Sequence, residues 1–207
     1  MSFLTDTLIG FFVAVMNSFD NIETCYYTDY NSGVQCRLYY APEEFFFRTP
    51  LPSPGESLES EVIIQDQILM KKDKLLHYID ILIDENELKL LIAGALARKK
   101  SKINLSVFIL GFTPSVLGFI ERAMNIPLVF FIKDSNGRNW QIGHNRNRAL
   151  IDNSEAGTGK KYEDNAGASI TITCNSPLFL YNFSLDHFSR PGDFNTDFNN
   201  DFFKYYD

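Results

Sequence analysis

Apolar and polar residues alternate in short runs along much of this chain, which is the pattern of strands rather than of long helices. Residues 35–40 (QCRLYY) and 43–48 (EEFFFR) are short and aromatic-rich, as strands tend to be. Residues 103–110 (INLSVFIL) and 168–174 (ASITITC) continue the pattern, and the second run alternates cleanly. The sequence therefore predicts a mainly β (α+β) fold.

Turn signals indicate how some of these runs connect. Residues 61–70 (EVIIQDQILM) and 75–84 (LLHYIDILID) flank the charged KKDK segment, and we expect them to form a long hairpin. A second hairpin is expected around DSNG at 134–137, because Asn-Gly favours the positive φ angles of a tight turn. Its strands are residues 128–133 and 139–143.

Two stretches suggest other structures. Residues 86–97 (NELKLLIAGALA) are rich in good helix formers, which predicts a helix that Gly94 weakens. Residues 152–167 are polar and contain several glycines, which predicts a loop.

The strongest helix signal begins at Thr113, an N-cap residue followed by Pro114 at the first helical position. We expect a helix over 114–125 that ends before Pro127. Four apolar side chains fall on one face of it and should pack on a sheet: Val116, Leu117, Ile120 and Met124.

A proline-rich segment, TPLPSPG at 49–55, divides the chain, since it excludes helix and removes backbone donors. The expected organisation is N-terminal strands over 1–48, a loop over 49–60, a β domain over 61–185 and a tail over 186–207. The apolar run at 8–16 (LIGFFVAVM) is too short to span a bilayer and lacks a basic leader. We expect it to be a buried strand or helix of a cytoplasmic product with no membrane partner.

Composition argues against several functions. The formal charge of −7 and a pI near 5.0 disfavour a surface that grips nucleic acid. The three cysteines show no zinc-type spacing, and although Cys25 and Cys36 could bridge, reduced thiols are favoured: Cys25, Cys36 and Cys174. The run 97–102 (ARKKSK) is the concentrated positive patch, a loop or strand flank that could pair with an acidic patch on another subunit.

No catalytic pattern accompanies the three histidines, His77, His144 and His187. Residues 154–161 (SEAGTGKK) superficially resemble a phosphate-binding loop. Ser154 replaces the first glycine, however, Lys161 replaces the hydroxyl residue, and a strand rather than a helix is expected to follow. We therefore expect a flexible inter-strand loop, no enzyme activity, and no cofactor or metal.

The order of parts over residues 103–183 resembles tail proteins from phages and prophages of Bacteroidetes-type bacteria. The resemblance rests on an apolar strand, a short helix (PSVLGFIERAMN), the hairpin LVFFIKDSNGRNWQIG, and a TGK loop at 157–160. An acidic-Asn-x-Gly step at 164–167, the strand SITITCNSP and the aromatic close LFLYNF complete it. These motifs cover about two-fifths of the chain, and none of them is catalytic.

The resemblance implies a tail-tube-like β-sandwich or barrel flanked by one helix, in a virion structural protein made in the host cytoplasm. Its partners would be copies of itself in a ring, commonly a hexamer, other tail or neck proteins, and DNA passing through the lumen without sequence-specific binding. The strand edges of 61–84 are then candidates for the inter-subunit sheet, and the Phe residues spaced four apart in the tail are candidates for an anchor. The candidate assembly contacts are Ile63, Ile64, Ile68, Tyr78, Ile81, Phe194, Phe198 and Phe202.

Three other functions stay open from the sequence. One is a head-to-tail connector or another neck component. A second is a monomeric ligand-binding β-protein, which would have a deep pocket. The third is a nucleotide-dependent enzyme that uses the GTGK segment and would lose hydrolysis on Lys160→Ala.

Overall fold

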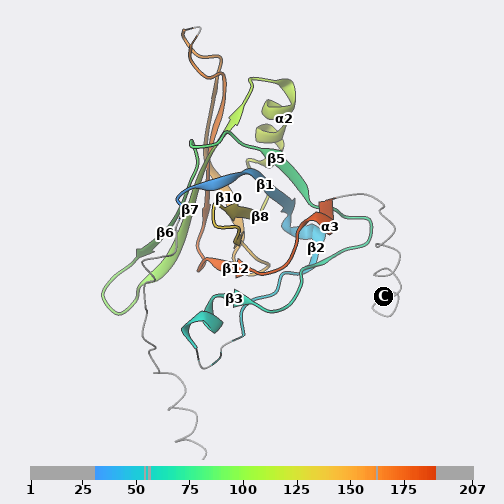
Figure 1. Ribbon diagram of the computed structural model, residues 1–207, viewed down its shortest axis with the longest axis vertical. Coiled ribbons are helices and arrows are strands. Elements are labelled where there is room, and N and C mark those ends of the chain that lie inside the picture. Colours follow the sequence, from blue (N-terminus) through green and yellow to red (C-terminus); the bar gives the residue numbers. More distant parts are fainter. Residues whose placement is uncertain (1–30, 54, 56, 162, 190–207) are drawn as a thin grey trace, which may run out of the picture.

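Strands make up most of the part of the chain that the computed structural model describes, which is residues 31–189 without 54, 56 and 162 (Figure 1). The strands are β1 Val34–Pro42, β2 Phe46–Arg48, β3 Ile63–Ile64, β4 Leu69–Met70, β5 His77–Asp80, β6 Glu87–Ala93, β7 Lys100–Leu110, β8 Leu128–Asp134, β9 Asn139–Ile142, β10 Ala149–Gly157, β11 Gly167–Cys174 and β12 Phe179–Tyr181. The helices are α2 Pro114–Ala123 and the short α3 Asp186–Ser189, with 3-10 turns η2 Glu43–Phe45 and η3 Leu58–Glu61.

Ten of these strands form one mixed sheet, in which the main path runs β3-β12-β9-β8-β10-β11-β7-β6. Strand β1 pairs with both β8 and β5, while β2 and β4 form a separate two-stranded sheet. Within the described residues the sheet does not close on itself. The prediction of a mainly β fold with one flanking helix is confirmed, as an open sheet without a closed barrel.

Strand β8 joins two hydrophobic cores, because both of its faces are buried. Leu128, Phe130 and Ile132 face one core, which also contains the inward side of β7 and β11. Val129 and Phe131 face a second core beside β12 and the small sheet. A strand buried on both faces has a nearly continuous apolar sequence, and this explains the run LVFFI.

Helix α2 begins as the sequence predicts. The hydroxyl of Thr113 accepts the backbone N–H of Val116 at 3.4 Å, and Pro114 occupies the first turn. The side chains of Val116, Phe119 and Ile120 pack against the first core. The expected apolar face is only partly covered, since Leu117 and Met124 are exposed.

Several strand predictions are confirmed, namely those around 35–40, 103–110, 168–174 and the hairpin about DSNG. The expected hairpin of 61–70 with 75–84 is wrong. Within those two segments, β3 pairs with β12, β4 pairs with β2, and β5 pairs with β1. Each short strand has found a long-range partner that neither turn chemistry nor local pattern encodes.

Two further predictions are corrected. Residues 87–93 form strand β6 rather than part of a helix, because pairing along β7 outweighs the modest helix preference of Leu, Ala and Lys. Much of the expected 152–167 loop belongs to β10, and only residues 158–166 connect it to β11. The polar sequence of this region reflects a strand exposed over most of its length.

No helix in the described part of the chain is long and apolar enough to cross a membrane. The apolar run at 8–16, Cys25 and the phenylalanine-rich tail from residue 190 lie outside the described residues.

Candidate self-assembly surface

One end of the large sheet is a four-stranded antiparallel unit in the order β6-β7-β11-β10. Strand β7 is its longest member and pairs with β6 on one side and with β11 on the other. Strand β11 then pairs with β10 along its whole length. The unit therefore has β6 as one outer strand and β10 as the other.

Strand β6 has no partner on its outer side among the described residues. Its seven residues are exposed except for Leu88, which is half-buried. Three successive apolar side chains point to alternating faces and are all exposed: Leu90 at 49%, Leu91 at 44% and Ile92 at 69%. Natural edge strands are normally protected by charges, proline or bulges. The first half of β6 carries Glu87 and Lys89, but its second half from Leu90 has no such protection, and an unprotected apolar edge invites pairing with another chain.

The β6–β7 hairpin extends away from the body of the molecule (Figure 1). Its turn depends on Gly94, whose φ of 119° is unfavourable for other residues. A Cβ atom at Gly94 would lie 2.7 Å from the carbonyl oxygen of Arg98. The tip also carries Leu96, which is 90% exposed.

Strand β10 provides the other edge. It is joined to β8 only at Ala149, opposite Leu128, so residues 150–157 have no described strand on their outer side, and helix α2 lies close to one part of β10. Neighbouring strands in this four-stranded unit are antiparallel, so its first strand, β6, and its fourth strand, β10, run in opposite directions. One edge could therefore pair with the other edge of a second copy as a continuous antiparallel ladder.

The two edges are offset along the strand direction. Strand β6 pairs with residues 100–106 of β7, whereas β10 lies, through β11, at the level of residues 103–110. The β6–β7 and β10–β11 hairpins accordingly project from different ends of the sheet (Figure 1). Such a stagger is what tilted strands in a closed sheet require.

The outward face of the four-stranded unit is polar at its centre, and it also carries exposed leucines, Leu91, Leu110 and Leu150, and charges of both signs towards its edges. In register across β7 and β11, this face presents hydroxyl and amide side chains at Asn104, Ser106, Ser169, Thr171 and Thr173. The opposite face of the same strands contributes the buried Ile, Leu and Val side chains of the first core.

Most of the sequence-derived contact residues in 61–84 lie inside the fold. Ile64, Ile68 and Ile81 are buried core residues, at 0%, 1% and 4% exposure. Ile63 is half-buried and pairs with Leu180. Their side chains support the two cores, and we assign them no role between copies.

Tyr78 is half exposed, but its ring is engaged within the chain. The guanidinium carbon of Arg37 lies 4.1 Å from its ring centroid, and Arg37 also pairs with Asp80 at 2.8 Å. These contacts fix a charged patch on the outer side of β5 and β1. The remaining candidates, Phe194, Phe198 and Phe202, lie outside the described residues.

The sequence prediction misses the residues of the β6 edge, Leu90, Leu91 and Ile92, because it assigns 86–97 to a helix. A hairpin signal was nevertheless present. Gly94 sits between two runs, and the second, 100–110, alternates over residues 103–107 and contains β-branched residues. Alternation in the second run was the stronger observation, and a strand of that length needs partners on both sides.

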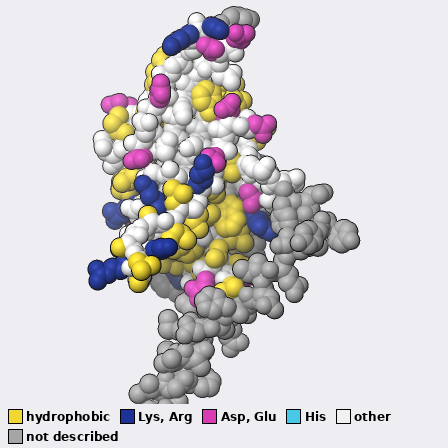
Figure 2. All heavy atoms as spheres, turned by 90° about the vertical axis from the view of Figure 1, so that its left-hand side faces the viewer, with side chains coloured by type: hydrophobic (Ala, Val, Ile, Leu, Met, Phe, Trp, Pro, Cys, Tyr) yellow, Lys and Arg dark blue, Asp and Glu magenta, His cyan; other side chains and the backbone are white. Residues whose placement is uncertain are grey.

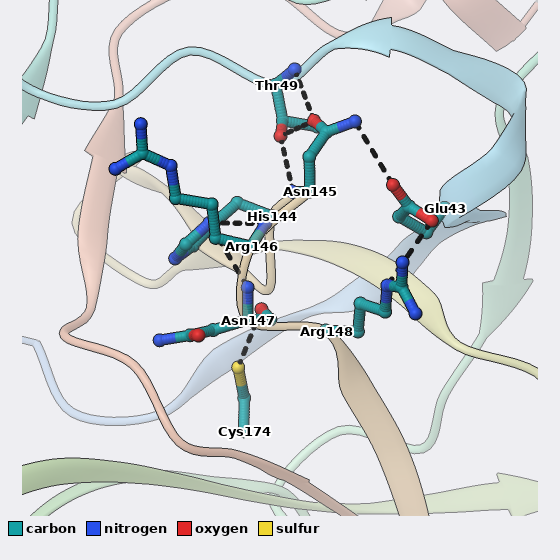
Figure 3. Close-up of polar contacts among 8 residues, drawn as sticks. All are labelled: Glu43, Thr49, His144, Asn145, Arg146, Asn147, Arg148 and Cys174. Atoms are coloured by element: carbon teal, nitrogen blue, oxygen red, sulfur yellow. Dashed lines mark hydrogen bonds and ion pairs between the residues drawn. The ribbon is translucent and has the colours of Figure 1, made fainter.

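A polar cluster lies just before β10 and joins the β9–β10 connection to Glu43, Thr49 and Cys174 (Figure 3). Asn145 accepts the backbone N–H of Thr49 at 2.8 Å and donates to Glu43 at 3.1 Å. Glu43 also pairs with Arg148 at 3.4 Å. The cluster ties the proline-rich loop to the β9–β10 connection, and its groups satisfy one another instead of facing an open cavity.

His144 belongs to this connection and is buried. Its Nδ1 atom accepts the backbone N–H groups of Arg146 and Asn147, at 3.2 and 3.4 Å. Burial, helped by the charge of Arg146, lowers the pKa of His144, so the neutral ring is favoured. The imidazole thus uses Nδ1 to order the β9–β10 connection.

Cys174 lies beneath the same loop, and its Sγ donates to the carbonyl oxygen of Asn147 at 3.4 Å. Burial raises the pKa of Cys174 to about 11. The thiol is therefore protonated and unreactive at neutral pH. Among the described residues Cys36 is the exposed free thiol.

The GTGK segment lies at the tip of the β10–β11 hairpin, followed by a strand. A carboxylate oxygen of Asp164 accepts the backbone N–H groups of Lys160 and Lys161, both at 2.8 Å. These bonds lower the pKa of Asp164. The backbone donors that a phosphate-binding loop would direct at its ligand are occupied here by a side chain of the same loop.

Other features of the described part offer no clear chemistry. No group of three His, Cys, Asp or Glu side chains there could hold a metal ion. A groove of about 370 Å³ runs between β1 and residues 184–186. Two of its charged groups already have partners within the chain, since Arg37 binds Asp80 and Tyr39 donates to Asp186.

Comparison with known proteins gives no family: no family model, curated protein or solved structure matches this chain.

Proposed function

We propose that this protein is a structural subunit that assembles head to tail with copies of itself, as a tail tube subunit or tube terminator of a phage-type virion. The observation that carries the proposal is the four-stranded unit with an exposed apolar edge at β6 and a second unpaired edge at β10. The virion role itself comes from the sequence resemblance over 103–183, since the comparisons supply no relative.

Pairing with β10 of the next copy would give β6 the partner strand that its outer edge lacks. A ladder along its seven residues would occupy backbone groups that water now solvates. Each hydrogen bond of such a ladder adds about 0.5–1.5 kcal/mol. Burial of the half-exposed Leu90, Leu91 and Ile92 adds the hydrophobic contribution.

The even number of strands matters for symmetry. When copies are related by rotation about one axis, β10 of one copy meets β6 of the next in the antiparallel sense. This is a heterologous contact, which generates a ring if the rotation closes and a helical filament if it does not. Barrels of about 16–18 strands leave an aqueous channel, so about four or more copies would enclose an open lumen.

The polar face of the unit suits the inner wall of such a ring. Hydroxyl and amide groups line its centre, and strand edges carry both signs of charge, as at Glu87, Lys89 and Glu155. The cations of this face, Lys100 and Lys102, lie at the end next to the β6–β7 turn, and a centre without clustered lysine and arginine releases few counterions from DNA and binds it weakly. DNA could then pass without adhering.

A cysteine cross-link tests the edge contact. Within one copy β6 and β10 are separated by two strands, hence about 14 Å apart at the usual strand spacing, and no disulfide can join them. Leu91→Cys would be combined in turn with Leu150→Cys, Asn153→Cys or Glu155→Cys, which all lie on the polar face. The background would carry Cys25→Ser and Cys36→Ser.

After mild oxidation, we expect at least one of these cysteine pairs to give a series of covalent multimers on a non-reducing gel. Each single-cysteine chain should stay monomeric. A dimer from Leu91→Cys alone would instead indicate a two-fold β6–β6 contact. That result, or no ladder from any pair, would refute head-to-tail pairing.

Negative-stain electron microscopy and light scattering over a concentration series test the larger assembly. Rings or tubes are expected. A monomer at every concentration would exclude the tube subunit. It would leave a terminator or head-to-tail connector that needs another virion protein, or a monomeric binding protein.

A further inference from the structure

The tip of the β6–β7 hairpin is strongly basic in an otherwise acidic protein. Four cationic side chains follow one another within five residues, at Arg98, Lys99, Lys100 and Lys102. The first three are exposed, and none of the four takes part in an ion pair among the described residues. This charge is available to an acidic partner.

Apolar groups lie among these cations. Leu96 at the tip is 90% exposed, and Leu91 lies opposite Lys102 in the β6–β7 register. Figure 2 shows the molecule from the side on which β6 and β7 lie, and apolar and basic side chains gather together there. The hairpin tip, defined here as residues 91–102, therefore fits a partner that carries both carboxylates and large apolar side chains.

The C-terminal sequence of this same chain has that composition. Residues 193–204 read DFNTDFNNDFFK, in which a carboxylate stands directly before a phenylalanine every four residues. The pairs are Asp193–Phe194, Asp197–Phe198 and Asp201–Phe202. Lys204 is the single cation from residue 191 to the end.

The position of α3 determines which hairpin the tail meets. Helix α3, the last described element before the tail, lies on the side of the molecule opposite to β6 (Figure 1). In a head-to-tail arrangement this side of one copy is turned towards the hairpin side of the next. This step rests on the head-to-tail assembly proposed above.

We propose that residues 190–207 of one copy bind the hairpin tip of a neighbouring copy. The Asp carboxylates pair with the cations of residues 98–102, and the phenylalanine rings cover Leu91 and Leu96. The contact would act beside the β6–β10 ladder and link consecutive copies by a second, salt-sensitive attachment.

A binding experiment tests the chemistry of this contact. A fluorescent peptide of residues 190–207 is titrated with the full-length chain carrying Phe194→Ser, Phe198→Ser and Phe202→Ser, so that its own tail does not compete. A second chain adds Arg98→Glu, Lys99→Glu and Lys100→Glu. A matched control instead adds Lys71→Glu, Lys72→Glu and Lys74→Glu, three exposed lysines away from the hairpin.

The hairpin reversal should weaken peptide binding at least tenfold, and the control should stay within twofold. Binding should also weaken when salt is raised from 50 to 500 mM. A peptide with its three repeat aspartates changed to lysine should bind the reversed hairpin better than the original one. Equal binding to the reversed and control chains would overturn the proposal.

A cross-link decides whether the contact joins two copies. The full-length chain with Leu96→Cys and Asn199→Cys, in the Cys25→Ser, Cys36→Ser background, is oxidised. Covalent multimers support docking between copies, whereas a monomer with an internal loop, or no cross-link, overturns it. Peptide binding without rings, tubes or filaments would refute the self-assembling tube subunit alone, and assembly without peptide binding would refute this inference alone.

Discussion

Substitution of Ile92 by lysine is the most informative single change at the β6 edge. Ile92 is 69% exposed, and it lies opposite Ser101 on an outer strand. The monomer should therefore tolerate the change within about 0.5 kcal/mol, as most surface positions do. Any larger effect on assembly must come from the contact between copies.

The expected magnitude follows from the exposed fraction. Complete burial of an isoleucine side chain contributes about 1.5–3 kcal/mol, so burial of the part now exposed contributes about 1–2 kcal/mol per contact. Its loss weakens each contact about 5- to 30-fold. A buried lysine charge adds a further penalty. In a closed ring the loss recurs at every contact.

Sedimentation velocity over a concentration series measures this effect, with thermal unfolding as the check on the monomer. The midpoint concentration for assembly should rise at least about fivefold, with the melting temperature within about 2 °C of the parent. Phe47→Lys is the control, because Phe47 is 63% exposed but lies on the separate β2–β4 sheet. An unchanged midpoint for Ile92→Lys would refute the role of the β6 edge.

Three further predictions concern the fold itself. Alkylation of the native protein should label Cys36 and spare Cys174, as read by peptide mass spectrometry, because only the first is exposed; equal labelling would contradict the burial of Cys174. Since the pKa of His144 is lowered in the folded state, the unfolded chain binds its proton more readily, and stability should fall as pH drops through about 6.5. His144→Asn keeps a nearby acceptor without titrating, so the difference between its denaturation midpoint and that of the parent should shrink or reverse from pH 7.5 to 5.5, and a constant difference would contradict this. Tyr181→Phe leaves the backbone N–H of Ile68 without its 3.3 Å partner and should cost about 1–3 kcal/mol of unfolding free energy, whereas a neutral result in urea denaturation would show that the bond contributes little.

The elements that sequence predicts well are those whose signals are local. Thr113 and Pro114 define the start of α2 by hydrogen bonding and fixed φ, which depend on adjacent residues alone. The turn after β8 is likewise self-contained. Asp134 accepts the backbone N–H of Asn136 at 2.9 Å, and Gly137 adopts a φ of 84°.

The prediction failed where pairing spans long distances. Ile63 and Ile64 pair with β12, more than a hundred residues away, and nothing in EVIIQDQILM distinguishes that partner from a neighbouring strand. The candidate contacts at Ile64, Ile68 and Ile81 lie in the cores of the chain. Once the supposed hairpin was divided among three partners, its apolar side chains entered the cores.

Strands β6 and β8 both carry apolar side chains on their two faces, but within a single copy only those of β8 are buried. In β8, apolar residues point to both faces, and both faces are buried by this chain. In β6, Leu90 and Ile92 point to one face and Leu91 to the other, yet all three are exposed. A strand that is apolar on both faces is normally one that protein covers on both faces. The described chain supplies that cover for β8 and leaves β6 without it, and a neighbouring copy whose β10 pairs with β6 would place its own side chains beside the three exposed apolar groups.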